Sequence, residues 1–305
     1  MLAPKDISWA TKKHYLHHSN PSRPLCATLF DKCVLRPRKN AAWKVLKCEA
    51  DGDKIIAKQT IQFLDNDNAN MLAGRIVQDC VNQHLLDGHS FDAVVRYGMA
   101  LFDEYEPRGW DDGKDERKLS VNRDEYDLVI KNAVDGIREA HSIAGINQIT
   151  GETEILTQLD GLDLPYSGFP DFSRRIELKT KWSGVAANTK SGKRSAALPS
   201  QPDWSHICQV AGYWAGTGLM QTIVYATAKD YRIFNADNCE RLTEQGLQSA
   251  LKHIIAKCAI RENLLKSTDS VEDMLRLVEP DFKHMWAWDM KPSLVDEAKT
   301  LWGFK

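Results

Sequence analysis

The sequence predicts an α/β protein with a central mixed β-sheet flanked by helices and with helical additions at both ends. Two observations support this prediction. Short segments rich in β-branched or aromatic residues occupy the middle of the chain, at 154–162, 168–172, 176–182, 222–227 and 231–235. Segments with apolar residues at helical spacing lie before, between and after them, at 70–86, 90–104, 123–142, 204–216 and 239–265. Strands that alternate with helices in this way are typical of the α/β class.

The length and composition are those of an ordinary globular protein. The chain has 305 residues, 43% of them hydrophobic and 27% charged, so it can form one large core or two smaller ones. We divide it into a basic N-terminal arm with a small subregion, 1–69, and a main domain with a C-terminal helical extension, 70–305. In the first part we expect short helices at 26–34 and 41–47, separated by a basic turn, and a small hairpin within 55–63.

The sequence contains no feature that predicts secretion or membrane insertion. The first twenty residues lack an apolar core, and no run approaches 18 apolar residues. The seven cysteines include no Cys-x-x-Cys pair and are an odd number, which is typical of reduced, mostly buried thiols. We therefore expect a cytoplasmic (intracellular) protein without a membrane partner.

One stretch, 167–182, combines acids and a lysine on short predicted strands. It reads SGFPDFSRRIELKTKW, and we interpret it as a strand, a polar turn and a returning strand. The hairpin brings Asp171 beside Glu177. Because side chains alternate along a strand, Glu177 and Lys179 share one face while Ile176 and Leu178 face the core.

This grouping suits metal-assisted hydrolysis of a phosphodiester. Asp171, Glu177 and the carbonyl of Leu178 are hard oxygen ligands of the kind that Mg²⁺ or Mn²⁺ accepts. Lys179 would then hold or deprotonate the attacking water. The alternative is an exposed hairpin in which Glu177 and Lys179 form a surface ion pair that contributes about 0 to 1 kcal/mol.

The predicted helix 204–216 adds a second pair, Gln209 and Tyr213, which share a face because they lie four residues apart. The order Asp, Glu-x-Lys, then Gln-x-x-x-Tyr resembles the RecB-like branch of the PD-(D/E)XK nuclease superfamily, including the CRISPR-associated RecB-like nucleases and the mitochondrial genome maintenance exonuclease. Upstream, Gly74 to Gln78 stands where that branch usually has Gly-x-x-x-His.

The resemblance implies a restriction-endonuclease-like core and a divalent-metal-dependent DNA exonuclease acting in recombination, repair or degradation. The catalytic set would be Asp171, Glu177, Lys179, Gln209 and Tyr213, and the metal ligands Asp171, Glu177, Leu178 and Gln78. Some members of the branch hold an iron-sulfur cluster, but Cys239 and Cys258 are too widely spaced for it, so we expect none. A restriction-like endonuclease and a non-catalytic DNA-binding subunit remain alternatives.

The distribution of charge suits a partner with a phosphate backbone although the formal net charge is −2. The resemblance implies that this partner is DNA, single-stranded or with free ends. Residues 1–50 carry ten basic and three acidic side chains, and residues 171–194 carry seven basic and two acidic ones. We expect a flexible basic loop over 183–203 and a DNA-binding rim formed by Arg174, Arg175, Lys181, Trp182, Lys190, Lys193 and Arg194.

Overall fold

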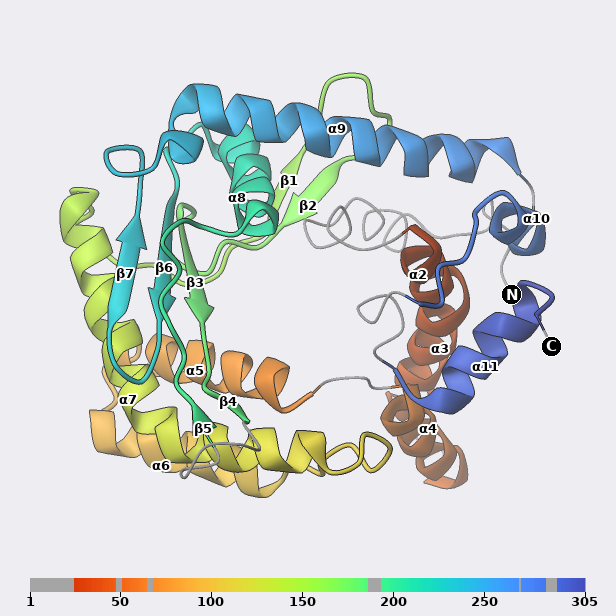
Figure 1. Ribbon diagram of the computed structural model, residues 1–305, viewed down its shortest axis with the longest axis horizontal. Coiled ribbons are helices and arrows are strands. Elements are labelled where there is room, and N and C mark those ends of the chain that lie inside the picture. Colours follow the sequence, from red (N-terminus) through yellow and green to blue (C-terminus); the bar gives the residue numbers. More distant parts are fainter. Residues whose placement is uncertain are drawn as a thin grey trace. The chain divides into compact units, whose positions relative to one another are not determined.

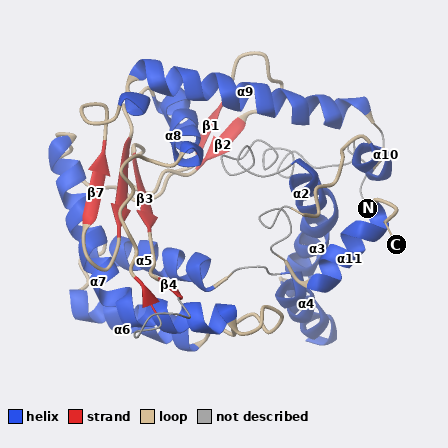
Figure 2. Ribbon diagram, in the orientation of Figure 1, coloured by secondary structure: helices blue, strands red, loops and turns tan. Residues whose placement is uncertain are grey.

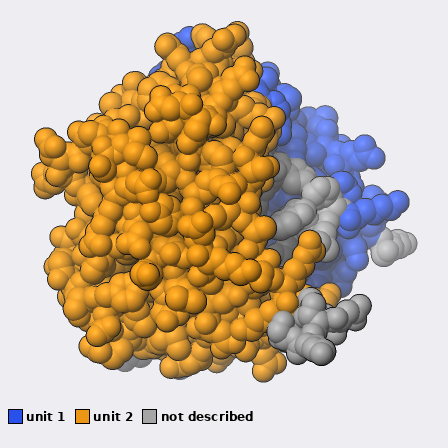
Figure 3. Space-filling model, turned by 60° about the vertical axis from the view of Figure 1, so that its left-hand side comes forward, with its two compact units in different colours: residues 1–66, 156–167, 253–305 blue, residues 67–155, 168–252 orange. Residues whose placement is uncertain are grey.

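The computed structural model describes residues 25–47, 51–64, 68–185, 193–268, 270–283 and 290–304 (Figure 1). It is a mixed α/β structure in which helices predominate and the sheets are small (Figure 2), so the α/β class is confirmed. The chain forms two compact units, coloured in Figure 3: residues 1–66, 156–167 and 253–305, and residues 67–155 and 168–252. The sequence prediction instead divided the chain once, after residue 69. None of the helices within the described ranges is long and apolar enough to cross a membrane.

The first unit is mainly helical. Its helices are α2 (Leu25–Leu29), α3 (Arg36–Leu46), α4 (Asp51–Leu64), α10 (Val271–Arg276), α11 (Pro292–Leu301) and the later part of α9 (Glu244–Ser267), with a π-helical segment at Phe30–Leu35. A two-stranded sheet pairs β1 (Ile155–Thr157) with β2 (Tyr166–Gly168), so the strand expected over 154–162 is much shorter.

Two predictions for the N-terminal region were wrong. The expected hairpin within 55–63 lies inside α4, because no glycine or proline between Lys54 and Leu64 interrupts the helix. The basic segment that begins at Arg36 does not separate two helices but starts α3. Pro37 lies in the first turn, where backbone N–H groups have no acceptor within the helix. Proline, which lacks this N–H, therefore loses no hydrogen bond there. The basic arm over 1–24 lies outside the described residues.

The second unit is built on a three-stranded sheet in the order β3 (Ile176–Thr180), β6 (Thr222–Ala226) and β7 (Tyr231–Phe234). β3 pairs with β6 in parallel, and β6 pairs with β7 antiparallel, so this sheet is mixed. α8 (Trp204–Thr217) lies in the crossover from β3 to β6. In the loop expected to be flexible, β4 (Gly184–Val185) and β5 (Lys193–Arg194) form a short antiparallel pair.

The predicted hairpin over 169–182 is not formed. Residues 169–172 are not a strand, and only one antiparallel bridge, between Phe172 and Ile176, joins them to β3. Ser173 and Arg174 make the turn with φ of 48° and 59°. Pro170 has no N–H to donate to a ladder, and β3 instead pairs with a strand more than forty residues later.

The helices α5 (Ala69–Leu85), α6 (Phe91–Asp103) and α7 (Lys114–Ile143) complete the second unit. Ser90 caps α6, whereas α7 starts nine residues before the predicted helix, and its Leu128 is 47% exposed. The core contains side chains of these helices and one face of the sheet, including Ile176, Leu178, Val224 and Ala226. The opposite face carries Glu177 and Lys179.

Candidate active site

Asp171 is held in place by two hydrogen bonds. Its Oδ2 accepts from the backbone N–H of Leu178 at 2.7 Å, and its Oδ1 accepts from the side-chain amide of Gln78 at 2.8 Å. Leu178 therefore contacts the acid through its amide, while the predicted role of its carbonyl as a metal ligand stays a prediction. With 7% of its surface exposed, Asp171 is a buried carboxylate.

The turn after Asp171 is anchored to α7. The Oγ of Ser173 lies 2.7 Å from Nε2 of His141, and it also accepts a hydrogen bond from the N–H of Thr150 at 3.1 Å. A left-handed conformation costs a non-glycine residue on the order of 1 to 3 kcal/mol. The contacts of Ser173 offset part of that cost and fix where the chain leaves Asp171.

Glu177 and Lys179 lie on the same face of β3, as their alternation predicts. The Oε1 of Glu177 accepts hydrogen bonds from Nζ of Lys179 at 2.6 Å and from Nε2 of Gln209 at 2.5 Å. Its Oε2 is buried and has no hydrogen-bond partner among the described residues. The ion pair joins a buried carboxylate to a partly buried ammonium group, since Glu177 is 3% and Lys179 22% exposed, and the alternative of an exposed surface pair is wrong.

Gln209 and Tyr213 extend this network along α8. The Gln209 amide also donates to the hydroxyl of Tyr213 at 2.7 Å, and that hydroxyl donates to the carbonyl of Phe169 at 3.2 Å. Gly168 is required here, because a Cβ at that position would lie 2.3 Å from the Tyr213 ring. The helix thus links Glu177 to the segment that leads into Asp171.

The buried charges shift each other's pKa. Burial and the neighbouring charge of Glu177 raise the pKa of Asp171 well above its usual range, against the opposing effect of Lys179. Burial likewise raises the pKa of Glu177, although Lys179 and Gln209 oppose the shift. Burial alone would lower the pKa of Lys179, but the charges of Glu177 and Asp171 outweigh it and raise that pKa. Lys179 is therefore an ammonium group.

Gln78 joins Asp171 to an acid that the sequence analysis did not identify. Its amide nitrogen lies 3.3 Å from Oε2 of Glu152, as well as bonding to Asp171. Glu152 also raises the pKa of Asp171 through its charge. A lone glutamate in a loop carries no sequence signal for such a role. In the described ranges, no three or more His, Cys, Asp or Glu side chains are grouped so as to hold a metal ion by themselves.

The predicted DNA-binding residues lie in different environments. Arg174 and Arg194 are exposed. Three others bond within the protein: Arg175 to the carbonyl of Met220, Lys181 to Asp203, and Lys193 to Asp124. Trp182 donates to Thr180 and packs against the core, and Lys190 lies outside the described residues.

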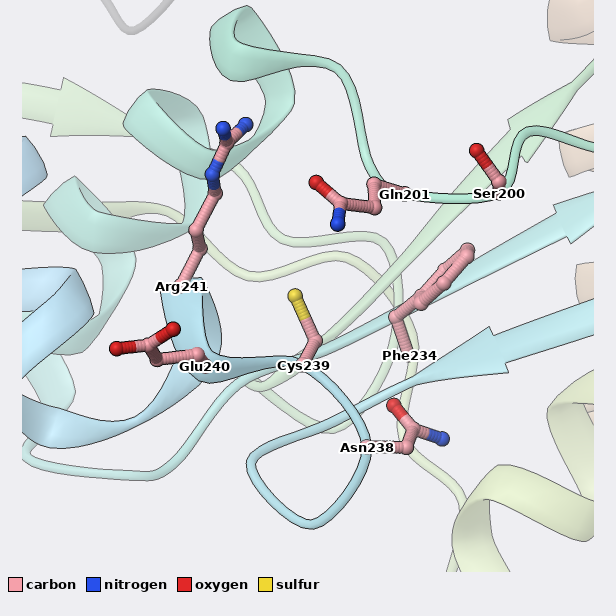
Figure 4. Close-up of a pocket in the computed structure, with 7 residues that line it drawn as sticks. All are labelled: Ser200, Gln201, Phe234, Asn238, Cys239, Glu240 and Arg241. Carbon is pink, nitrogen blue, oxygen red and sulfur yellow. The ribbon is translucent and has the colours of Figure 1, made fainter.

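A cavity of about 280 Å³ lies elsewhere in the second unit (Figure 4). Its lining is Ser200, Gln201, Phe234, Asn238, Cys239, Glu240 and Arg241, of which Asn238 is committed to backbone hydrogen bonds. Figure 4 shows Gln201 and Cys239 pointing toward the same space. None of the predicted catalytic residues lines it, so the acid and lysine cluster is a separate site.

Comparison of the chain with protein-family models, with curated proteins and with solved structures finds no match in any of the three.

Proposed function

We propose that this protein is a divalent-metal-dependent deoxyribonuclease with a restriction-endonuclease-like core, acting as an exonuclease of the RecB-like kind. The observation that carries the proposal is the convergence of Asp171, Glu177 and Lys179 in one buried cluster, although Asp171 does not belong to the same strand as the other two. Burying two carboxylates beside each other costs free energy, and such costs concentrate at functional sites.

The donor set fits Mg²⁺ or Mn²⁺. One oxygen of Glu177 is buried without a hydrogen-bond partner in the described structure, and a buried carboxylate oxygen in that state is costly unless a cation or another donor meets it. Asp171 and Glu177 would hold the ion, with the Leu178 carbonyl and Gln78 as the further predicted ligands. A bound divalent ion polarises the phosphate and lowers the pKa of a bound water.

The remaining residues have distinct parts in this proposal. Lys179, kept charged by its two acidic neighbours, positions the water and the phosphate as a cation and does not act as a base. Gln209 holds Glu177 in place, and Tyr213 holds Gln209. The exposed Arg174 and Arg194 contact the DNA backbone, while Lys181 and Lys193 reach it only by exchanging their carboxylate partners for phosphate.

The test compares wild type with Asp171→Asn, Glu177→Gln and Lys179→Met. With Mg²⁺ or Mn²⁺, each variant should cleave DNA at least about 100-fold more slowly, since each loses a ligand or a positioned charge. Melting temperatures with and without Mn²⁺ give a readout that does not depend on cleavage. Metal should stabilise the wild type and should stabilise the Asp171 and Glu177 variants much less. Wild-type rates in any of the three would remove that residue from the site.

The choice between exonuclease and endonuclease rests on DNA ends. End-labelled linear DNA should be degraded progressively by the wild type while covalently closed circles persist. Rapid nicking of the circles, which disappears in Glu177→Gln, would assign an endonuclease to the same site.

A further inference from the structure

His206 lies on the face of α8 that serves the acid and lysine cluster. It precedes Gln209 by three residues and Tyr213 by seven, so the three side chains form one stripe along the helix. Its side chain is 22% exposed, which leaves part of the ring open to a ligand.

The register of the sheet places His206 beside Lys179. Lys179 pairs with Tyr225 across the parallel strands β3 and β6, so both side chains stand on the face that carries Glu177. The hydroxyl of Tyr225 reaches Nδ1 of His206 at 2.6 Å. The imidazole therefore covers the sheet next to the catalytic lysine.

The hydrogen bonds of Tyr225 indicate which imidazole nitrogen carries the proton. Its hydroxyl oxygen accepts from the backbone N–H of Asp203 at 3.2 Å, and Nδ1 of His206 is the acceptor that the described residues offer for the hydroxyl proton, which favours donation from Tyr225 to Nδ1. With Nδ1 as the acceptor, the proton of the neutral ring resides on Nε2. No hydrogen bond joins Nε2 to any part of the chain that the structure describes.

The surroundings keep this ring neutral. Burial, followed by the positive charge of Lys179, lowers the pKa of His206 to about 3, and Lys181 acts in the same direction. Asp203, whose carboxylate lies 3.7 Å from Nδ1, opposes the shift without reversing it. At neutral pH, His206 is therefore a hydrogen-bond donor that does not repel the ammonium group beside it.

We infer that His206 donates a hydrogen bond from Nε2 to a phosphate oxygen of the bound nucleic acid, next to the oxygen that Lys179 attracts. This inference rests on the proposed nuclease function and adds a substrate-contacting residue to it. A third cation beside Lys179 and Lys181 would be repelled, whereas a neutral N–H meets an anionic oxygen without that cost.

The experiment compares His206→Ala with His206→Gln, whose side-chain amide carries an N–H at a distance from the backbone similar to that of Nε2. His89→Ala, an exposed histidine in the same unit, is the matched control. The value of kcat/KM for cleavage of linear DNA with Mg²⁺ is measured for each, together with the melting temperature. We expect kcat/KM of His206→Ala to fall about 10- to 100-fold, which is the effect of losing one hydrogen bond to a charged group. His206→Gln should recover most of that loss, and His89→Ala should match the wild type.

Three results would overturn the inference. His206→Ala with wild-type kcat/KM would exclude a contact with the substrate. His206→Ala and His206→Gln could also lose kcat/KM and melting temperature to the same extent. That result would mean that His206 acts by packing against Tyr225, since the centroids of the two rings lie 5.7 Å apart. A wild-type protein that cleaves no DNA with Mg²⁺ or Mn²⁺ would overturn the proposed function itself, and this inference with it.

Discussion

The amide of Gln78 donates a hydrogen bond to Oδ1 of Asp171 and turns the same nitrogen toward Glu152. A neutral donor thus lies between two acids. An amide nitrogen cannot ligate a metal, so Gln78 becomes a ligand only by turning its oxygen toward the ion. In the described structure it separates the carboxylates.

Gln78→Glu tests this separation. A third carboxylate beside Asp171 and Glu152 should lower the melting temperature of the metal-free protein, because like charges then meet at short range. The same change should raise Mn²⁺ affinity, by roughly tenfold, since a carboxylate is a better ligand than an amide. Calorimetric titration measures the affinity, and Gln83→Glu on the same helix is the control. Identical titrations for Gln78→Glu and wild type would place residue 78 outside the metal's surroundings.

Gly168→Ala tests whether Tyr213 holds Gln209 in position. The added methyl group would lie 2.3 Å from one carbon of the Tyr213 ring and 2.9 Å from another, so the ring must move. Overpacking of this kind costs about 1 to 3 kcal/mol of folding free energy. Displacing Tyr213 also releases Gln209 from Glu177, and DNA cleavage should fall about tenfold or more.

Gly109→Ala is the matched control for Gly168→Ala, because nothing lies within 4 Å of a Cβ there and its φ is not positive. Denaturant unfolding and cleavage rates are measured for both variants. A Gly168→Ala protein with normal rates would show that the site does not depend on the position of Tyr213.

His141→Gln tests the anchor of the turn that follows Asp171. Burial, together with the positive charge of Arg175, lowers the pKa of His141 below its usual value of about 6.5, although its bond to the Ile137 carbonyl opposes the shift. The unfolded chain therefore binds this proton more readily than the folded one, and wild-type stability is lost as the pH falls below about 6.5. Glutamine keeps an acceptor for the Ser173 hydroxyl but does not titrate.

The melting temperature of His141→Gln should accordingly fall less steeply than that of wild type between about pH 7 and pH 5. His89→Gln, at an exposed position, should follow the wild type. Parallel curves for His141→Gln and wild type would mean that His141 contributes nothing to the acid sensitivity of the fold.

Elements with strong local patterns were predicted well from the sequence. The helices around Gln78 and Gln209 and the strands at 222–226 and 231–234 lie within two residues of their predicted bounds, because apolar periodicity and strand-forming residues agree there. The alternation that places Glu177 and Lys179 on one face was also correct, since it depends only on β3 being a strand.

The failures involve information that is not local. The strand partner of β3 lies at 222–226, and no pattern within 169–182 reveals this, so the nearer segment was taken as its partner. Glu152 approaches the site through Gln78 on α5, and His206 reaches it because α8 packs beside the sheet. Neither residue stands out from the other polar residues in its own part of the sequence. In α4, the exposed Ile55 and Ile56 favoured a strand locally, whereas the absence of a turn-forming residue after them allows the helix to continue.

The parallel pairing of β3 with β6 has a consequence for how the protein is made. Parallel strands cannot close as a local hairpin, so Glu177 and Lys179 obtain their full surroundings only after the crossover with α8 has been synthesised. On the ribosome, the acids are synthesised before Gln209 and Tyr225, the residues that surround them in the folded protein. An unfinished chain that ends before residue 222 therefore carries the acids and the lysine without the strand that pairs with theirs, and on the proposed function it should be inactive.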